Sequence, residues 1–177
     1  MEIQDFLTLW EGKWFSQRSN YDFNRNVAES HKSELTIETL AFNHPTVVEF
    51  AQSQDIPTSE QILGLQMGWD NSVDWGKPKQ TGSLLYLFLP HPEHSHHGQL
   101  RRSPLKTGQK ALVGKYLFAV DESLTLILEH GPLQIEERLW FASPNLRLRT
   151  SLVLQNHQFS HSAFYTEIRK LPPTKTE

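Results

Sequence analysis

Two arginines in the stretch EERLWFASPNLRLR (136–149) are the side chains best suited to hold an anionic ligand, and a glutamate of the same stretch could accept hydrogen bonds from it. Arg147 and Arg149 are two residues apart, so a β-strand places both on one face. If residues 142–144 form a three-residue loop, Glu137 lies directly opposite Arg149; loops of two or four residues give other pairings, one of which sets Arg138 opposite Arg149. Opposite charges stabilise a cross-strand pair and like charges destabilise it, so we expect the three-residue loop.

This charged face has two possible environments. Charges that alternate with leucines usually face water, which would make the stretch an ordinary surface hairpin. Alternatively, the face lines the inside of a barrel, where planar guanidinium groups pair with the carboxylates of a ligand. The pattern alone leaves both interpretations open.

Aromatic and further basic residues extend the candidate site. Trp69 and Trp75 lie in a segment rich in Gly, Asn and Pro, where they either stack on a flat ligand or fill the end of a core. Arg18 and Tyr21 lie on the first expected strand and face either ligand or solvent. The stretch HPEHSHH (91–97) contains four histidines (His91, His94, His96 and His97) without regular ligand spacing, so we expect no metal site.

Composition excludes several classes of function. The net charge of −3 over 177 residues argues against broad binding of nucleic acid or anionic membranes. No apolar run approaches the roughly 20 residues of a membrane span, and the first residues do not resemble a secretion signal. The chain has no cysteine, so it cannot hold a ligand through a thioether of its own. No nucleophile elbow, phosphate-binding loop or dinucleotide fingerprint is present.

Mostly two-residue periodicity predicts an all-β protein with a short amphipathic helix at 1–11, ended by Gly12, and a second at 45–54. We expect Pro45 at the first position of the second helix and Asn43 or His44 as its cap. The expected strands are 13–21, 33–41, 61–69, 82–89, 111–120, 123–129, 132–141, 145–155 and 158–170. Such even spacing favours a closed antiparallel, up-and-down, lipocalin-like barrel, with a sandwich as the alternative. We expect one domain, 1–171, and a tail, 172–177.

Five stretches together resemble the S-type phycobiliprotein lyases, the chromophore lyase CpcS/CpeS family. They are GKWFSQRSNY (12–21), KSELTIETL (32–40), MGWDNSVDWGKPKQTGS (67–83), EERLWFASPNLRLRTS (136–151) and FYTEIRK (164–170). The resemblance implies a ten-stranded lipocalin-like barrel related to fatty-acid-binding proteins. It also implies attachment of a linear tetrapyrrole (a bilin such as phycocyanobilin or phycoerythrobilin) by a thioether bond to a cysteine of an apo-phycobiliprotein.

Carried over by motif, the resemblance assigns bilin binding to Arg18, Trp69, Trp75, Arg147 and Arg149. It makes Glu137 the candidate catalytic residue, although Glu136 precedes it and a slip of one residue would exchange the two. The chain also departs from the family pattern. Tyr21 and Asp22 stand near a position where relatives often have histidine, and Tyr165 stands near a position where they often have cysteine.

The resemblance further implies that the bilin is a substrate, so no cofactor is expected. The expected partner is an apo-phycobiliprotein subunit of phycocyanin, allophycocyanin or phycoerythrin type, with a homodimer or a second lyase subunit as further possibilities. The expected location is the cyanobacterial cytoplasm or a plastid stroma. Two alternatives remain: a non-catalytic lipocalin-type carrier of a bilin or fatty acid, and a barrel used only for protein contacts.

Overall fold

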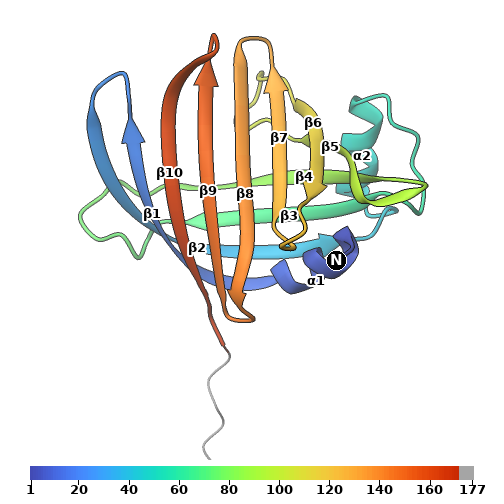
Figure 1. Cartoon of the computed structure of the whole chain (residues 1–177), viewed down its shortest axis with the longest axis horizontal. Helices are drawn as coiled ribbons and strands as arrows, with labels where there is room; N and C mark the ends of the chain where they lie inside the picture. The colour runs from blue at the N-terminus through green and yellow to red at the C-terminus, as the bar shows by residue number, and fades with distance from the viewer. Residues whose placement is uncertain (172–177) are drawn as a thin grey trace, which may run out of the picture.

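A computed structural model describes residues 1–171, in which ten antiparallel strands form a closed barrel with two short helices (Figure 1). Each strand pairs with the next in sequence, and β1 pairs with β10 to close the barrel. The elements are α1 (Ile3–Trp10), β1 (Gly12–Asp22), β2 (Val27–Leu40), α2 (Pro45–Ser53), β3 (Leu63–Asp70), β4 (Thr81–His91), β5 (His94–Arg102), β6 (Leu112–Phe118), β7 (Leu124–His130), β8 (Leu133–Ser143), β9 (Leu146–Gln155) and β10 (Gln158–Arg169). The barrel prediction is confirmed, and the expected tail, 172–177, lies outside the described residues.

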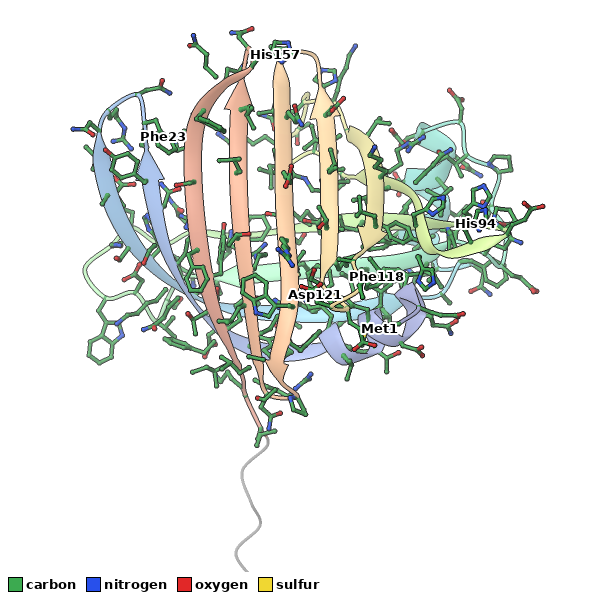
Figure 2. All side chains as sticks on the ribbon, viewed as in Figure 1. Met1, Phe23, His94, Phe118, Asp121 and His157 are labelled. Carbon is green, nitrogen blue, oxygen red and sulfur yellow. The ribbon has the colours of Figure 1, made fainter. Side chains whose placement is uncertain are left out.

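The strand β5 is the one element that the sequence pattern did not predict. The histidine stretch 91–97, expected between strands, forms the hairpin that joins β4 to β5, with His94 near its tip (Figure 2). On the inward face of β5, Leu100 is the only large apolar side chain between Gly98 and Arg102. A strand with so few apolar residues lacks the alternation that marks half-buried strands.

The helix α1 packs its apolar face into one end of the barrel. Its residues Ile3, Phe6, Leu7 and Trp10 are all buried. The Trp14 indole N–H donates a 2.9 Å hydrogen bond to the backbone carbonyl of Trp10, which ties the helix to β1. Burying each such side chain contributes about 1.5–3 kcal/mol, so α1 is a structural part of the barrel core.

The helix α2 packs against the barrel from outside. Val47 and Ala51 are buried against the outward-facing Leu85 and Leu87 of β4. The expected helix start is confirmed, because Pro45 is the first helical residue and the residue before it is the cap. No helix within residues 1–171 combines the length and the apolar character needed to cross a membrane.

The β8–β9 hairpin has a different register from the one expected. Residues 144–145 form a two-residue turn, and a bulge at Ala142 shifts the pairing beyond it. The predicted three-residue loop is therefore wrong, and Glu137 lies opposite Ser151 rather than Arg149. The observed register differs from the expected one by two residues, and such a shift leaves each side chain on the same face of the sheet. Glu137, Arg147 and Arg149 therefore still share one face.

Candidate functional site

The inner face of β9 and β10 is charged. Arg147 and Glu167 are completely buried and Arg149 is 7% exposed, so the interpretation of this hairpin as a solvated surface is wrong. Glu167 lies directly across the strand pair from Arg147, and Tyr165 lies across from Arg149. The backbone register alone thus brings a buried carboxylate and an aromatic ring against the two arginines.

Two arginines and two glutamates form a charge-balanced network inside the barrel. The Arg147 Nε donates to Glu167 Oε2 at 2.5 Å, and Arg149 Nη2 donates to Glu167 Oε1 at 3.2 Å. The Ser16 hydroxyl, from β1, donates to the same carboxylate at 3.3 Å. On the other side, Arg149 Nη1 lies 3.5 Å from Glu137 Oε1. Such pairing is what makes buried charges tolerable.

The network shifts the pKa values of Glu167, Arg147 and Arg149. Burial alone would raise the pKa of Glu167, but the two guanidinium groups hold it below its ordinary value. Burial lowers the pKa of Arg147 to about 10. The pKa of Arg149 rises in spite of burial, because the carboxylates of Glu167 and Glu137 face it. Glu167, Arg147 and Arg149 therefore stay charged at neutral pH.

Aromatic rings cover the two arginines. The Arg147 guanidinium lies 4.7 Å from the ring centre of Trp10 and 5.0 Å from that of Trp14, deep beside α1. The Arg149 guanidinium lies 3.7 Å from the ring centre of Tyr165. Cation–π contacts of this kind contribute about 0.5–2 kcal/mol, more when the cation is desolvated. Arg147 is thereby enclosed, whereas Arg149 borders a cavity.

That cavity, of about 300 Å³, collects four of the predicted residues from four different strands. Arg18 of β1, Trp69 of β3, Glu137 of β8 and Arg149 of β9 all line it. The Glu137 Oε2 atom is buried and has no hydrogen-bond partner within residues 1–171, so it remains available to a ligand. The slip to Glu136 is excluded for this role, because Glu136 is exposed.

Trp69 owes its position to a glycine on the neighbouring strand. Gly82 lies directly opposite it in the β3–β4 pair, and a Cβ atom there would overlap the indole ring. The missing side chain lets the indole lie against the β4 backbone, with a half-buried face toward the cavity.

Two predicted ligand residues lie outside this cavity. Arg147 is sealed beneath it, and Trp75 is 91% exposed on the loop between β3 and β4. Asp74, next to Trp75, does line the cavity, and its carboxylate accepts a 3.0 Å hydrogen bond from the backbone N–H of Lys32. Binding roles for Arg147 and Trp75 stay predictions.

Tyr86 and Arg102 line the same cavity and were not predicted from the sequence. Burial raises the pKa of Tyr86 to about 12; the Glu137 carboxylate adds to the increase, while Arg102 and Arg149 oppose it. The phenol therefore remains a hydrogen-bond donor at neutral pH. Because Arg102 lies on the strand that the sequence pattern missed, no motif pointed to it.

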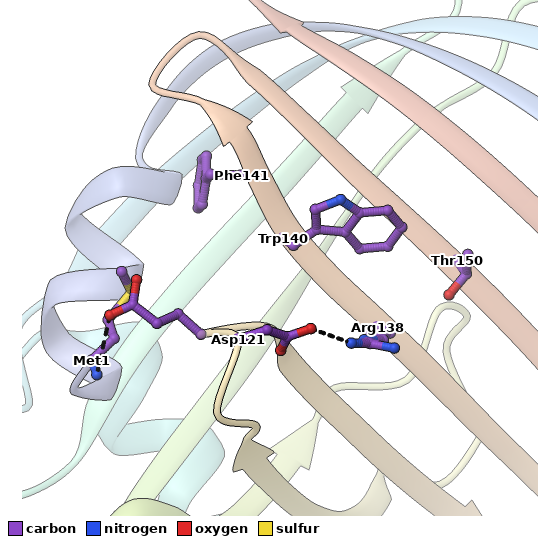
Figure 3. A pocket seen from close by; sticks show the side chains of 7 residues that line it. Met1, Asp121, Arg138, Trp140, Phe141 and Thr150 are labelled. Atoms are coloured by element: carbon purple, nitrogen blue, oxygen red, sulfur yellow. Dashed lines mark hydrogen bonds and ion pairs between the residues drawn. The ribbon is translucent and has the colours of Figure 1, made fainter.

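Two other features lie apart from this cavity. A hollow of about 470 Å³ lies beside β8 (Figure 3), where Arg138 Nη2 pairs with Asp121 at 2.6 Å; it contains none of the predicted ligand residues. On the β4–β5 hairpin, the imidazole rings of His91, His94 and His97 lie 5.0–5.5 Å apart, centre to centre. Within residues 1–171, no three potential ligand side chains are arranged to hold a metal ion.

Comparison with known proteins supports the resemblance noted in the sequence. A family model described as CpeS-like protein matches residues 2–170. The chain belongs to the CpeS-like protein family. It is 45% identical over 175 residues to chromophore lyase CpcS/CpeS 1 of Synechocystis sp., covering 99% of this chain and 94% of that relative. It is 37% identical over 169 residues to chromophore lyase CpcS/CpeS of Thermosynechococcus vestitus, covering 96% and 93% of the two chains.

A solved structure agrees with the fold of this CpeS-like chain. The S-type phycobiliprotein lyase CPES of Guillardia theta superposes with a TM-score of 0.81, covering 98% of this chain and 95% of the other at 22% identity. The implied ten-stranded, lipocalin-like barrel is therefore confirmed.

Proposed function

We propose that this chain is a phycobiliprotein lyase, which binds a bilin such as phycocyanobilin and attaches it to a cysteine of an apo-phycobiliprotein subunit. One observation carries the proposal: in a chain of the CpeS-like family, Arg18, Trp69, Glu137 and Arg149 converge on one cavity from four strands. A carrier that binds a bilin or fatty acid without transferring it is the alternative.

The chemistry of the cavity suits an open-chain tetrapyrrole. Arginine side chains bind the propionates of the bilin through charge-assisted hydrogen bonds. The free Glu137 Oε2 accepts hydrogen bonds from pyrrole N–H groups and thereby favours a protonated, more electrophilic chromophore. The Trp69 indole covers a ring face. Catalysis then consists mainly of positioning the bilin and polarising it.

The size of the cavity suits a lyase that holds part of the bilin and leaves the rest accessible to the acceptor protein. About 300 Å³ is at the small end of ligand sites, so a four-ring pigment is only partly enclosed and the remainder extends from the mouth. The acceptor cysteine adds its sulfur to the ethylidene carbon of the first ring, and its proton is transferred to the neighbouring ring carbon, so nothing is oxidised or released. The lyase contains no cysteine and therefore cannot trap its own substrate as a thioether. We propose that no cofactor takes part.

The reaction requires an acceptor protein with a cysteine. We propose an apo-phycobiliprotein subunit as the acceptor, a homodimer or second lyase subunit as a further partner, and the cyanobacterial cytoplasm as the location.

Mixing the protein, free phycocyanobilin and an apo-phycobiliprotein tests the proposal. A lyase yields a covalent, zinc-fluorescent band on a denaturing gel, and we expect Arg149→Ala and Glu137→Gln to reduce it at least tenfold. Arg138→Ala is the matched control, because Arg138 faces away from the cavity and pairs with Asp121. Bilin binding without a covalent band indicates a carrier, and absence of binding indicates a contact module. If Arg149→Ala and Glu137→Gln both bind and transfer the bilin as well as the wild type does, the proposed site is refuted.

A further inference from the structure

Arg102 enters the cavity from the side opposite the charged network. It follows Leu100 on the inward face of β5 and lies directly across the strand pair from the buried Tyr86. In the closed order of ten strands, β5 is five strands from β10 in either direction. Arg102 and Tyr165 therefore approach the cavity, which both line, from opposite sides of the barrel.

The charges around the cavity are paired in one part and unpaired in another. Arg147 and Arg149 share the carboxylates of Glu167 and Glu137, two positive groups with two negative groups. The Asp74 carboxylate, also at the cavity, lies 3.2 Å from the ammonium group of Lys77. Each of the carboxylates of Asp74, Glu137 and Glu167 therefore already has a cationic partner within residues 1–171.

By contrast, two arginines that line the cavity have no counter-ion in the described part of the chain. Among residues 1–171, no carboxylate lies within 4.0 Å of the guanidinium nitrogens of Arg18 or Arg102. The Nε atom of each is buried and lacks a hydrogen-bond partner in the same part of the chain. A buried, unsatisfied donor is unfavourable unless a ligand completes it.

We propose that Arg102 binds one of the two propionates of the bilin, with Arg18 positioned for the other. The proposal rests on the proposed bilin-binding function and assigns the ligand acids to the two unpaired arginines. A bilin carries two carboxylates, and Arg18 and Arg102 are the two cavity-lining guanidinium groups without a carboxylate partner in residues 1–171. Lys32 also lines the cavity without such a partner, but its side chain is exposed. Arg149, already paired with two glutamates, holds the Glu137 carboxylate in place at the cavity. The planar fork of arginine matches a carboxylate in two parallel hydrogen bonds.

Binding of phycocyanobilin and of its dimethyl ester, measured by absorbance titration, tests this assignment. We expect Arg102→Gln to weaken phycocyanobilin binding roughly 10–100-fold, the range for loss of hydrogen bonds to a charged group. The ester has no carboxylate to lose, so wild type and Arg102→Gln should bind it equally. Arg101→Gln is the matched control: Arg101 is the next residue on β5, faces outward and bonds Gln99 and the Leu100 carbonyl.

Other outcomes overturn the assignment in distinguishable ways. Wild-type affinity of Arg102→Gln for phycocyanobilin refutes it while the lyase function stands. An equal loss for acid and ester means that Arg102 only shapes the cavity, which also refutes it. If Arg102→Gln does not fold, Arg102→Lys, which keeps the charge but not the fork, should show the same selective loss to a smaller degree. Failure of the wild type to bind either compound refutes the proposed function itself.

Discussion

Replacing Glu167 with glutamine removes the negative partner of a completely buried arginine. Arg147 has no other carboxylate within ion-pair distance in residues 1–171, and Arg149 loses one of its two partners. For the 3.2 Å pair of Arg149 and Glu167, Coulomb's law at an effective dielectric constant of about 20 gives about 5 kcal/mol before desolvation is considered. Measured losses on breaking one side of a buried pair are about 3–5 kcal/mol, which is the expected decrease in unfolding free energy.

Urea unfolding followed by tryptophan fluorescence measures this loss, because Trp10 and Trp14 lie against Arg147. In a thermal scan the same loss corresponds to a decrease in Tm of roughly 6–20 °C for a chain of this size. Glu34→Gln is the matched control, since Glu34 pairs with Lys170 at the surface and should cost less than about 1 kcal/mol.

A double variant separates loss of the pair from loss of packing. Arg147→Met combined with Glu167→Leu removes both charges and keeps similar volumes, so it should be more stable than Glu167→Gln alone. The reasoning is refuted if Glu167→Gln costs no more than the surface control, because the buried arginine would then need no counter-charge.

Three further outcomes follow from the structure. The pKa of Glu167 in the folded protein lies below the ordinary 4.5, so the Glu167 carboxylate stabilises the fold fully above pH 4.5 and loses this effect as the pH falls further. The difference in urea midpoint between wild type and Glu167→Gln should therefore shrink in acid. A difference that stays constant with pH would contradict this prediction. Gly82→Ala should displace Trp69 and weaken bilin binding at least tenfold in an absorbance titration. Gly68→Ala is its control, because a Cβ atom there meets nothing closer than 3.8 Å, and equal effects would rule out the role given to Gly82. Trp75→Ala should change the unfolding free energy by less than about 0.5 kcal/mol, because the side chain is 91% exposed; a loss above 1 kcal/mol in urea unfolding would show a contact that the fold lacks.

The barrel was predictable because most strands combine regular alternation with turn residues at their ends. The strand β5 was not, because the stretch HSHHGQLRR has too few apolar residues to show alternation. The β8–β9 register failed for another reason: the bulge at Ala142 adds a residue that no side-chain pattern marks. Bulges follow from local backbone geometry, which sequence periodicity does not report.

The site was only partly predictable because β9 and β10 reverse the usual distribution of polarity. Phe164 and Ile168 are exposed on the outer face of β10, while Glu167 between them is buried. Hydrophobic alternation alone would have placed this glutamate in water. The signal that could have identified it is the pairing of β9 with β10, which places Glu167 opposite Arg147. Family motifs identified the arginines, but the partner that neutralises them comes from the three-dimensional register.

The plug formed by α1 has a consequence for the order of events. Because Phe6, Leu7 and Trp10 fill one end of the barrel, a bilin cannot enter at that end and leave at the other. Free bilin must then enter, and the conjugated bilin must leave, through the same opening of the cavity that Arg18 and Trp69 line. An acceptor protein that binds before the bilin would cover this opening and prevent the bilin from entering. Turnover should therefore pass through a maximum as the acceptor concentration rises, which a steady-state rate series would reveal.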